Sequence, residues 1–432
     1  MVDENIFFDY EKRPGLKQKN KFIKEQIKPL VSIITSYYNS KEFLKQTVNS
    51  VINQTFPYWE WIIVDDGSTQ KETYEILKSL EAKDSRIKVY HKQNEGLAKG
   101  RDYAIKYSTT KYILPLDADD LIDPTYIETL YFTLETNKEA SFAFTNSVGF
   151  GKYIYLSNPD FDSERMKTDK HITATSLIRK EKIIELGGYG LAKRYVNEDW
   201  HLWLRMLAKG YYPVQVSFYG FWYRRRKISL LSEINDEKKK ENILRLQDLK
   251  AEADKITKKV NAKIYPQDDK TNIEYNKLDF TEDIKPIDNG DNVLYIIPWL
   301  KSDEKLFKKI KEESKNKNVI ILTTKYLGYV NRQKLEQYST IFDLTTFLDK
   351  KYWLGFIEYI LNSRKVIKIV VDKTQDKKIL NFVSNKNVET NLIEYKDDEK
   401  EYKRLIKRYN FNQSIIGRIL RKIRRSFIWK DG

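Results

Sequence analysis

Three carboxylates lie within four residues at Asp117-Ala118-Asp119-Asp120. Carboxylates at this spacing repel one another, and a cation between them relieves the repulsion. Mg²⁺ and Mn²⁺ prefer oxygen ligands, commonly one or two carboxylates together with substrate phosphates. The run directly follows the apolar stretch 112–116, which is typical of a buried strand. This placement favours a divalent metal site over the alternative, a solvated acidic turn.

Two further acidic pairs could take part in chemistry. Asp65 and Asp66 follow the apolar run 59–64, and a carboxylate at a strand end can bind a nucleotide base or ribose. The alternative is a turn that caps the next helix. Glu198 and Asp199 begin a helix-like segment, where one of them could act as a general base toward a hydroxyl. The alternative there is capping by two acids, which the helix dipole favours.

Two polar segments could bind a diphosphate. Asn94 and Gly96 form a turn, and Arg101 follows in the next predicted helix, so an amide and a guanidinium become available. The triplet 224–226 consists of three arginines that could clamp a leaving phosphate. A solvated helix face and a solvated strand edge are the respective alternatives.

Predicted strands and helices alternate along the sequence, and the polar groups follow the ends of the strands. The hydrophobic pattern predicts strands at 31–35, 59–64, 87–91 and 112–116, and helices at 42–54, 72–82, 97–107, 124–136, 176–186 and 199–209. Such alternation indicates an α/β fold with a mostly parallel, doubly wound sheet. Ligands bind these sheets beyond the carboxyl ends of the strands, where both acidic turns fall.

The chain divides by composition into five parts. We expect an N-terminal extension (1–30), a doubly wound α/β domain (31–232), a helical and polar linker (233–290), a smaller Rossmann-like α/β domain (291–395) and a basic amphipathic tail (396–432). The second α/β domain follows from predicted strands at 292–298, 319–324 and 367–371 with helices between them.

Composition excludes several classes of protein. The 432 residues include no cysteine and three histidines, which argues against a disulfide framework, thiolate metal sites and a histidine-rich zinc site. No apolar run approaches the roughly 18 residues of a membrane span, and the first ten residues lack a signal-peptide pattern, so we expect a cytoplasmic protein. The net charge is +16, of which residues 403–432 contribute ten Lys and Arg against one Asp. Because the excess is concentrated in the tail, we expect no nucleic-acid partner.

The acidic and polar motifs described above, in this order along the predicted strands and helices, resemble those of the family 2 glycosyltransferases of the GT-A fold. The resemblance covers 31–232 and rests on five motifs, at 31–39, 62–68, 94–101, 112–120 and 197–200. The family transfers a sugar from a nucleotide-sugar with inversion at the anomeric carbon. Two departures from its pattern are Asp102, where an amide is usual, and the absence of a histidine after Tyr223-Arg224.

The resemblance implies a role for each candidate residue. Asp199 would be the catalytic base, supported by Glu198, and Asp119 would coordinate Mn²⁺ or Mg²⁺. The nucleotide-sugar would be bound by the remaining candidates, with Asp66 on the uracil or ribose: Thr35, Tyr38, Asp66, Asn94, Arg101, Asp117 and Arg224.

The activity expected from this resemblance is metal-dependent, inverting transfer from a nucleotide-sugar, with UDP as the expected nucleotide. The acceptor would be a hydroxyl of a cell-envelope polysaccharide or lipid-linked glycan. The alternative is a catalytically silent scaffold of the same fold that recruits partners at the membrane.

The two C-terminal parts have their own expectations. Residues 291–395 resemble, more weakly, the N-terminal half of a GT-B glycosyltransferase, without its glycine-rich turn, and we expect a non-catalytic module for acceptor, partner or homo-oligomer contacts. Residues 412–430 combine isoleucines at helical spacing with arginines and Trp429. This pattern suits an anionic membrane surface, or alternatively a helix docked on the protein itself or on a partner.

Overall fold

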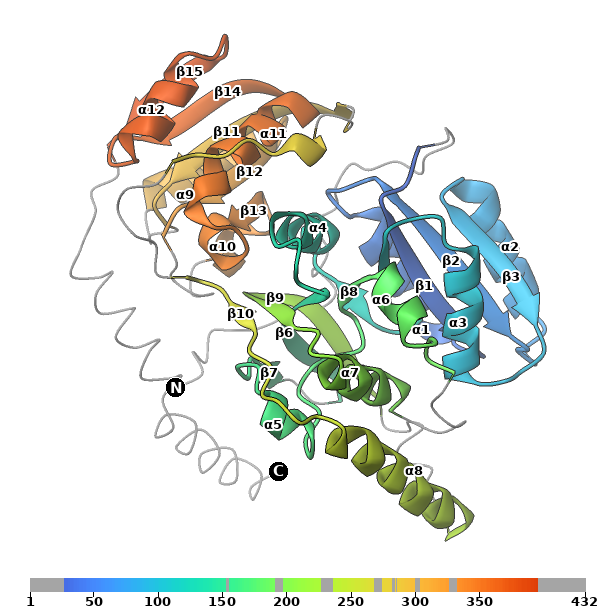
Figure 1. Cartoon of the computed structure of the whole chain (residues 1–432). Coiled ribbons are helices and arrows are strands. Elements are labelled where there is room, and N and C mark those ends of the chain that lie inside the picture. Colours follow the sequence, from blue (N-terminus) through green and yellow to red (C-terminus); the bar gives the residue numbers. More distant parts are fainter. Residues whose placement is uncertain are drawn as a thin grey trace, which may run out of the picture. The chain divides into compact units, whose positions relative to one another are not determined.

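The computed structural model in Figure 1 describes residues 27–152, 155–190, 197–226, 236–267, 274–281, 284, 286–299, 304–325 and 332–394. The chain divides into two compact units, the first within residues 17–267 and the second within residues 268–432 together with the N-terminal 1–16. Most of the expected N-terminal extension and the whole tail, including 412–430, lie outside the described residues.

The first unit begins with four parallel strands and the helices that join them. The strands lie in the order β4-β1-β2-β3, and Val31 of β1 is in register with both Trp59 of β2 and Tyr112 of β4. Helix α3 packs on β1 and β2, so the strand side chains that face this helix are buried in the core. The elements are β1 Val31–Tyr37, α1 Lys41–Ile52, β2 Trp59–Asp66, α2 Thr73–Lys83, β3 Ile87–Lys92, α3 Leu97–Tyr107 and β4 Tyr112–Pro115.

The sheet continues past β4 with strands of mixed direction. Its full order is β10-β9-β6-β8-β4-β1-β2-β3, with β5 paired to β9 and β7 paired to β6. Strand β8 is antiparallel to β4 and β6, whereas β6 and β9 are parallel. The elements are β5 Leu121–Ile122, α4 Tyr126–Thr136, β6 Phe142–Gly151, β7 Tyr155–Ser157, α5 Ser163–Met166, β8 Leu177–Arg179, α6 Lys180–Glu185, α7 Glu198–Ala208, β9 Pro213–Arg225, α8 Asp236–Asp254 and β10 Lys263–Ile264.

The helix predicted at 176–186 is wrong in its first half. Residues 177–179 form the strand β8, and helix α6 begins only at Lys180. All three residues of β8 are buried between β4 and β6. Hydrogen bonding and burial from two neighbouring strands therefore override the local helical spacing.

The unit extends beyond the expected boundary at residue 232. Helix α8 packs on α7, and Leu249, Ala253 and Ile256 belong to the same buried cluster as Leu202 and Trp203 of α7. Strand β10 then adds to β9 at the edge of the sheet. The expected linker 233–290 therefore includes a described helix and strand that belong to the first unit, whose limit is residue 267.

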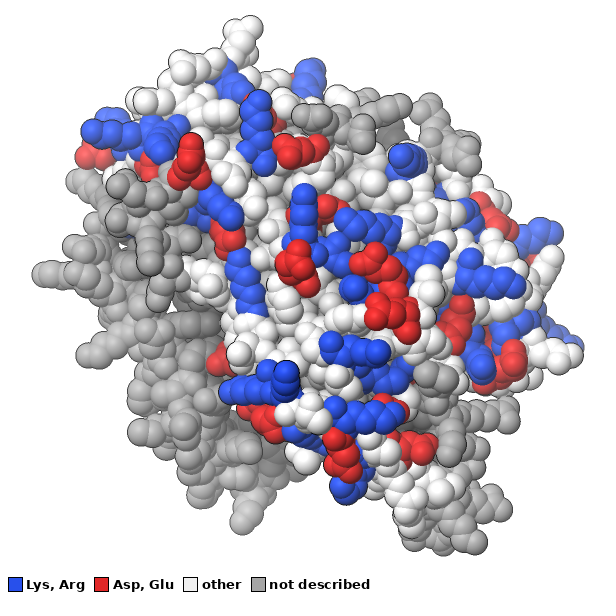
Figure 2. Space-filling view, viewed as in Figure 1, with Lys and Arg blue, Asp and Glu red and all other residues white. Residues whose placement is uncertain are grey.

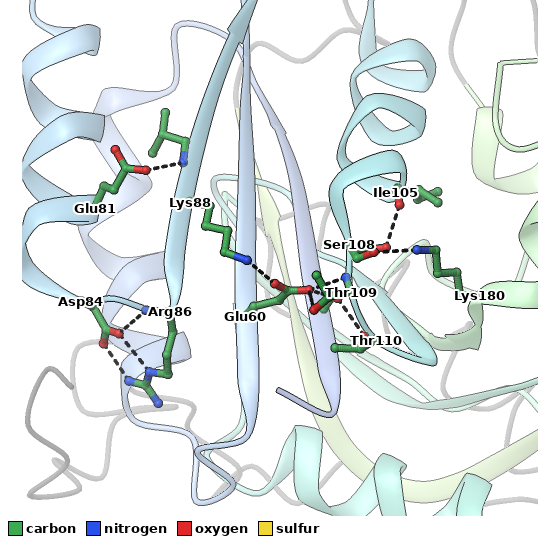
Figure 3. A network of polar contacts seen from close by, with 12 residues as sticks. Glu60, Glu81, Asp84, Arg86, Lys88, Ile105, Ser108, Thr109, Thr110 and Lys180 are labelled. Atoms are coloured by element: carbon green, nitrogen blue, oxygen red, sulfur yellow. Dashed lines mark hydrogen bonds and ion pairs between the residues drawn. The ribbon is translucent and has the colours of Figure 1, made fainter. Parts of the chain in front are cut away.

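Polar contacts fix the loops at the amino end of this sheet (Figure 3). Glu60 accepts hydrogen bonds from Ser32 Oγ and the Thr109 backbone N–H, both at 2.7 Å, and binds Lys88 Nζ at 2.8 Å. Beside them, Asp84 and Arg86 form a buried ion pair at 2.7 Å, with the Arg86 guanidinium stacked 3.6 Å above the Trp59 ring. Since these charges are paired within the chain, the amino edge offers little to a ligand.

The second unit is a smaller α/β fold built on a five-stranded parallel sheet. Its strand order is β13-β12-β11-β14-β15. This is the Rossmann order, in which successive strands are added first on one side of β11 and then on the other. The elements are β11 Ile287–Ile297, α9 Glu304–Glu313, β12 Asn318–Thr323, α10 Arg332–Leu335, β13 Thr340–Asp343, α11 Trp353–Ser363, β14 Arg364–Asp372, α12 Lys377–Ser384 and β15 Glu389–Ile393, with 3₁₀ turns at Asp279–Thr281, Leu344–Thr346 and Lys350–Tyr352. The α/β class predicted for both domains is confirmed, and the comparison of this unit with a GT-B half stays a prediction.

Two surface properties follow from the described residues. Among them, no helix is long and apolar enough to cross a membrane. On the face shown in Figure 2, Lys and Arg are interspersed with Asp and Glu wherever residues are described. The described part of this face therefore carries charges of both signs.

Candidate active site

The loops that follow β1 and β2 are fastened to each other. Asn39 has a positive φ of 48°, and its side-chain oxygen accepts the backbone N–H groups of Thr69 and Gln70 at 3.0 and 3.1 Å. Ser68 Oγ accepts the Asn39 N–H, and Asp65 Oδ1 in turn accepts the Ser68 N–H at 3.0 Å. These bonds give the carboxyl edge of the sheet a fixed shape before any ligand binds.

Asp66 organises the loop that follows β3. Its Oδ1 binds Lys92 Nζ at 2.8 Å and the Glu95 N–H at 3.0 Å, and its Oδ2 accepts the Gly96 N–H at 2.7 Å. Both carboxylate oxygens therefore have partners within the chain. A nucleotide that binds here would meet Asp66 through an oxygen that already accepts at least one bond.

The other residues expected near the nucleotide differ in exposure. Thr35 is buried, and its hydroxyl has partners within the chain. It donates to the Leu116 carbonyl at 2.7 Å and accepts the Trp61 indole N–H at 2.9 Å. Its side chain thus holds β1, β2 and β4 together, and only its surroundings can contribute to a site. Tyr38, in contrast, is 47% exposed, and Asn94 is also exposed. These two side chains remain accessible to a ligand.

Arg101 joins the two acidic segments that the sequence singles out separately. Its Nη1 binds Glu198 Oε1 at 2.5 Å, and its Nη2 binds Asp117 Oδ1 at 2.8 Å. The guanidinium is 1% exposed and lies 5.3 Å from the Tyr189 ring centroid. Arg101 on α3 therefore links the acidic turn that follows β4 to the start of helix α7.

The charges of this group shift one another's pKa. Burial alone would lower the pKa of Arg101, but Asp117 and Glu198 outweigh burial and raise it. Burial raises the pKa of Glu198, and neighbouring Asp199 and Asp117 add to the effect while Arg101 opposes it. Arg101 therefore favours the ionised form of the Glu198 carboxylate.

Asp199 has a different partner. Its Oδ2 binds Lys170 Nζ at 2.7 Å, and its Oδ1 lies 2.8 Å from the backbone N–H of Trp200. Burial would raise the pKa of Asp199, but Lys170 and Arg101 together bring it below its ordinary value. The candidate base is therefore ionised at neutral pH.

The acidic turn after β4 is held by the end of β9. Asp120 is buried and accepts the Arg224 backbone N–H at 2.8 Å, and the Arg224 Nε donates to the Asp119 carbonyl at 2.7 Å. The guanidinium also binds Gln46 and stacks 4.2 Å from the Phe43 ring centroid. These contacts give Arg224 a supporting role toward the turn, and the phosphate contact expected from the sequence stays a prediction.

Arg226, two residues further on, meets the candidate metal ligand directly. Its Nε lies 2.7 Å from Asp119 Oδ2. Burial raises the pKa of Asp119, Arg226 opposes this, and the nearby Asp117 adds to it. Of the three arginines at 224–226, Arg226 is thus the one placed to exchange an in-chain carboxylate for a phosphate.

Asp102, the departure noted in the sequence, anchors a glycine-rich loop. Its Oδ1 and Oδ2 accept the backbone N–H groups of Tyr189 and Gly190, both at 2.7 Å. A Cβ at Gly188, which has a φ of +78°, would lie 2.4 Å from Asp102 Oδ1. The carboxylate and the glycines therefore fit each other, and an amide could accept only one of the two bonds through its oxygen.

A divalent metal fits the acidic turn only with help from the substrate. Among the described residues there is no group of three His, Cys, Asp or Glu side chains placed to hold a metal. Asp119 nevertheless offers an oxygen donor on a side chain that is 21% exposed, beside two other carboxylates that favour a positive charge. This donor set suits Mg²⁺ or Mn²⁺ bound by one carboxylate and by phosphate oxygens.

Sequence reasoning missed Lys170 and Arg226 as partners of the acidic groups. Lys170 lies in a loop between α5 and β8, in a sequence rich in lysine, so no local signal distinguishes it. Arg226 belongs to the arginine triplet, and the alternation of side chains along β9 could have separated its role from that of Arg225.

The fold and the site together are those of a glycosyltransferase. The family model of glycosyl transferase family 2 matches residues 32–200. TuaG of Bacillus subtilis, whose name assigns it to teichuronic acid biosynthesis, is 33% identical over 193 residues, which span 43% of this chain and 74% of TuaG. The chain therefore belongs to glycosyltransferase family 2.

Two other proteins are also similar to part of the chain. WfaP of Escherichia coli, named as a UDP-Glc:α-D-GlcNAc-diphosphoundecaprenol β-1,3-glucosyltransferase, is 32% identical over 202 residues, which span 45% of this chain and 77% of WfaP. The structure of S. aureus TarS 1-349 with UDP-GlcNAc matches with a TM-score of 0.40 and 19% identity, over 48% of this chain and 61% of that one.

Proposed function

We propose that this protein transfers a sugar from a UDP-sugar to a hydroxyl of a cell-envelope polysaccharide or lipid-linked glycan, with inversion and with the help of Mn²⁺ or Mg²⁺. The observation that supports this most is the bridge made by Arg101, which ties Asp117 on the donor side to Glu198 beside the candidate base. One buried side chain thereby sets the spacing between the group that holds the donor and the group that receives the proton.

On the donor side, the acidic turn and its neighbours would bind the nucleotide-sugar. Asp119 would hold the metal, and Asp117 would face the ribose or sugar. When bound, the metal supplies positive charge to the diphosphate that leaves. Arg226, which now pairs with Asp119 at 2.7 Å, is placed to bind a phosphate when Asp119 takes the metal. The exposed Tyr38 and Asn94 would complete the contact with the nucleotide.

On the acceptor side, Asp199 would act as the general base. As the acceptor oxygen bonds to the anomeric carbon, its proton passes to Asp199 Oδ2, and the bond from that carbon to the diphosphate breaks with its electron pair leaving on the phosphate. The lowered pKa of Asp199 keeps it ionised and ready to accept the proton. Glu198 would fix the start of α7 through Arg101 rather than take part in proton transfer.

The names of the relatives support the choice of substrates. WfaP is named for UDP-Glc as donor and for a diphosphoundecaprenol-linked sugar as acceptor, and TuaG for a cell-envelope polysaccharide. We extend these classes of substrate to the present chain, which is 33% identical to TuaG over 43% of its length and 32% identical to WfaP over 45% of its length. A location at the inner face of the membrane, through residues 412–430, would bring the enzyme to such acceptors.

The test is nucleotide release from a panel of UDP-, GDP- and TDP-sugars, each measured with Mn²⁺ and with EDTA. We expect metal-dependent release from a UDP-sugar, loss of the metal response in Asp119→Ala, and loss of transfer with unchanged UDP binding in Asp199→Asn. Release that persists in EDTA would remove the metal from the proposal. Silence across the whole panel, together with an absence of UDP binding by calorimetry, would favour the catalytically inactive scaffold.

A further inference from the structure

Among the described residues, Lys170 is the cation in direct contact with the candidate base. It lies in the loop between α5 and β8, and its Nζ is 2.7 Å from Asp199 Oδ2. The Asp199 side chain is 5% exposed and that of Lys170 is 32% exposed. The ion pair therefore lies at the boundary between the buried start of α7 and solvent.

Several charged groups surround Asp199, and Lys170 is the cation that contacts its carboxylate directly in the described structure. The charged and titratable groups that face Asp199 are Glu198 on α7, Arg101 on α3, Tyr189 after α6 and Lys170 itself. The two Nη atoms of Arg101 bind Glu198 and Asp117. Within the described part of the chain, an ion-pair contact with the Asp199 carboxylate is thus made by Lys170. Tyr223 on β9 faces Lys170 from the other side.

We propose that Lys170 is a positioning residue for sugar transfer, which keeps the Asp199 carboxylate ionised and oriented toward the acceptor hydroxyl. This inference rests on the proposed role of Asp199 as the base. Lys170 neither gains nor loses a proton in the step: the acceptor proton goes to Asp199, and the ammonium stays charged. Its contribution is electrostatic, because a buried carboxylate beside Glu198 would otherwise favour the protonated form.

The proposal makes a statement about the pH profile that a purely structural role does not. Loss of a contacting cation raises the pKa of a carboxylate by about 1 to 3 units. The acid limb of kcat/KM reports the pKa of the base in the free enzyme. If Lys170 serves only to pack the loop, its removal lowers kcat without moving that limb.

The experiment compares Lys170→Met, Lys170→Gln and Lys170→Arg with Lys167→Met as the matched control. Lys167 lies in the same loop region, pairs with Glu164 at 2.8 Å and has a side chain 27% exposed, but it does not contact Asp199. The probes are UDP-glucose and UDP-N-acetylglucosamine with Mn²⁺ and with water as the acceptor, so that no glycan acceptor has to be known. Release of UDP is followed from about pH 3 to about pH 9, because the ordinary pKa of an aspartate is about 3.9 and that of Asp199 is lower.

We expect the acid limb to move up by about 1 to 3 pH units in the Met and Gln variants, and to stay near its original position in the Arg variant and in the control. An unmoved limb in both neutral variants would overturn the proposal even if their rates fell. The Gln variant decides the outcome if the Met variant fails to fold, because Gln retains a hydrogen-bond donor for Oδ2.

Asp199→Asn separates this inference from the proposed function. If that variant hydrolyses the donor as fast as the original protein, Asp199 is not the base and both proposals fall. If it is inactive while the neutral Lys170 variants keep an unmoved acid limb, the base stands and only the role of Lys170 is lost.

Discussion

Replacement of Arg101 by Met tests the buried bridge between the donor side and the acceptor side. The guanidinium is 1% exposed, and the Glu198 side chain that it binds is 9% exposed. Removal of one partner of such a pair leaves a buried charge without compensation and costs about 3 to 5 kcal/mol. For a unit of this size that corresponds to a fall of roughly 6 to 20 °C in Tm.

The loss should depend on pH in a defined direction. Without Arg101, the pKa of Glu198 rises further, because burial and Asp199 already raise it and the opposing charge is gone. A carboxyl group with a folded-state pKa above its unfolded value binds more protons in the folded state, so stability falls as pH rises through the interval between the two values. The variant should therefore be closest to the original protein near pH 5 and furthest from it near pH 8.

Two controls make this reasoning refutable by scanning calorimetry. Arg86→Met removes another buried arginine of this unit, paired with Asp84 at the opposite edge of the sheet, and should reduce stability while UDP release continues. The double variant Arg101→Met with Glu198→Gln should recover part of the lost stability, because a neutral amide needs no counter-charge. A loss in Arg101→Met that is below about 1 kcal/mol, or is equal at both pH values, would contradict the argument.

Three further predictions concern the supports of the site. Asp102→Asn leaves one acceptor oxygen where two backbone N–H groups each need one. The free energy of unfolding, measured in urea, should fall by about 1 to 3 kcal/mol. Gly188→Ala should cost at least about 1 kcal/mol in the same assay, since alanine is strained at a φ of +78° and its Cβ meets Asp102; an unchanged midpoint would contradict the tight fit. Arg226→Met should weaken binding of UDP together with Mn²⁺ by up to about 5-fold in calorimetry, because the phosphate loses the guanidinium proposed for it, whereas Arg225→Met, whose guanidinium lies over the Tyr223 ring, should leave that affinity unchanged.

The parallel half of the first sheet could be predicted because its signals are local. Strands β1 to β3 and helix α3 fall within three residues of the ranges expected from apolar runs and helical spacing. The segment β8 could not, because three residues carry too little periodicity and their state is decided by β4 and β6. Likewise β10 and α8 join the first unit through contacts with β9 and α7 that no spacing in their own sequence specifies.

The same division holds for the candidate site. Arg101, Asp117 and Glu198 are recognisable one by one from the sequence, and the fold brings them into direct contact. What the sequence does not contain is the choice of partner: Thr35 turns its hydroxyl into the core, and Lys170 pairs with Asp199 across a separation of 29 residues. Such pairings depend on loop paths, and many lysines in this chain have identical local surroundings.

The packing of α8 on α7 also limits how this protein can be recombined with its relatives. The shared family segment ends at residue 200, directly after the candidate base, yet the helix that begins there has its apolar side covered by Leu249, Ala253 and Ile256. A chimera that joins this chain to a relative at residue 200 or 232 would separate the base from the surface that keeps its helix in place. A junction after residue 267 keeps helix α7 and the residues that cover it in the same protein. Exchange of donor or acceptor specificity is therefore best attempted by transfer of the whole first unit.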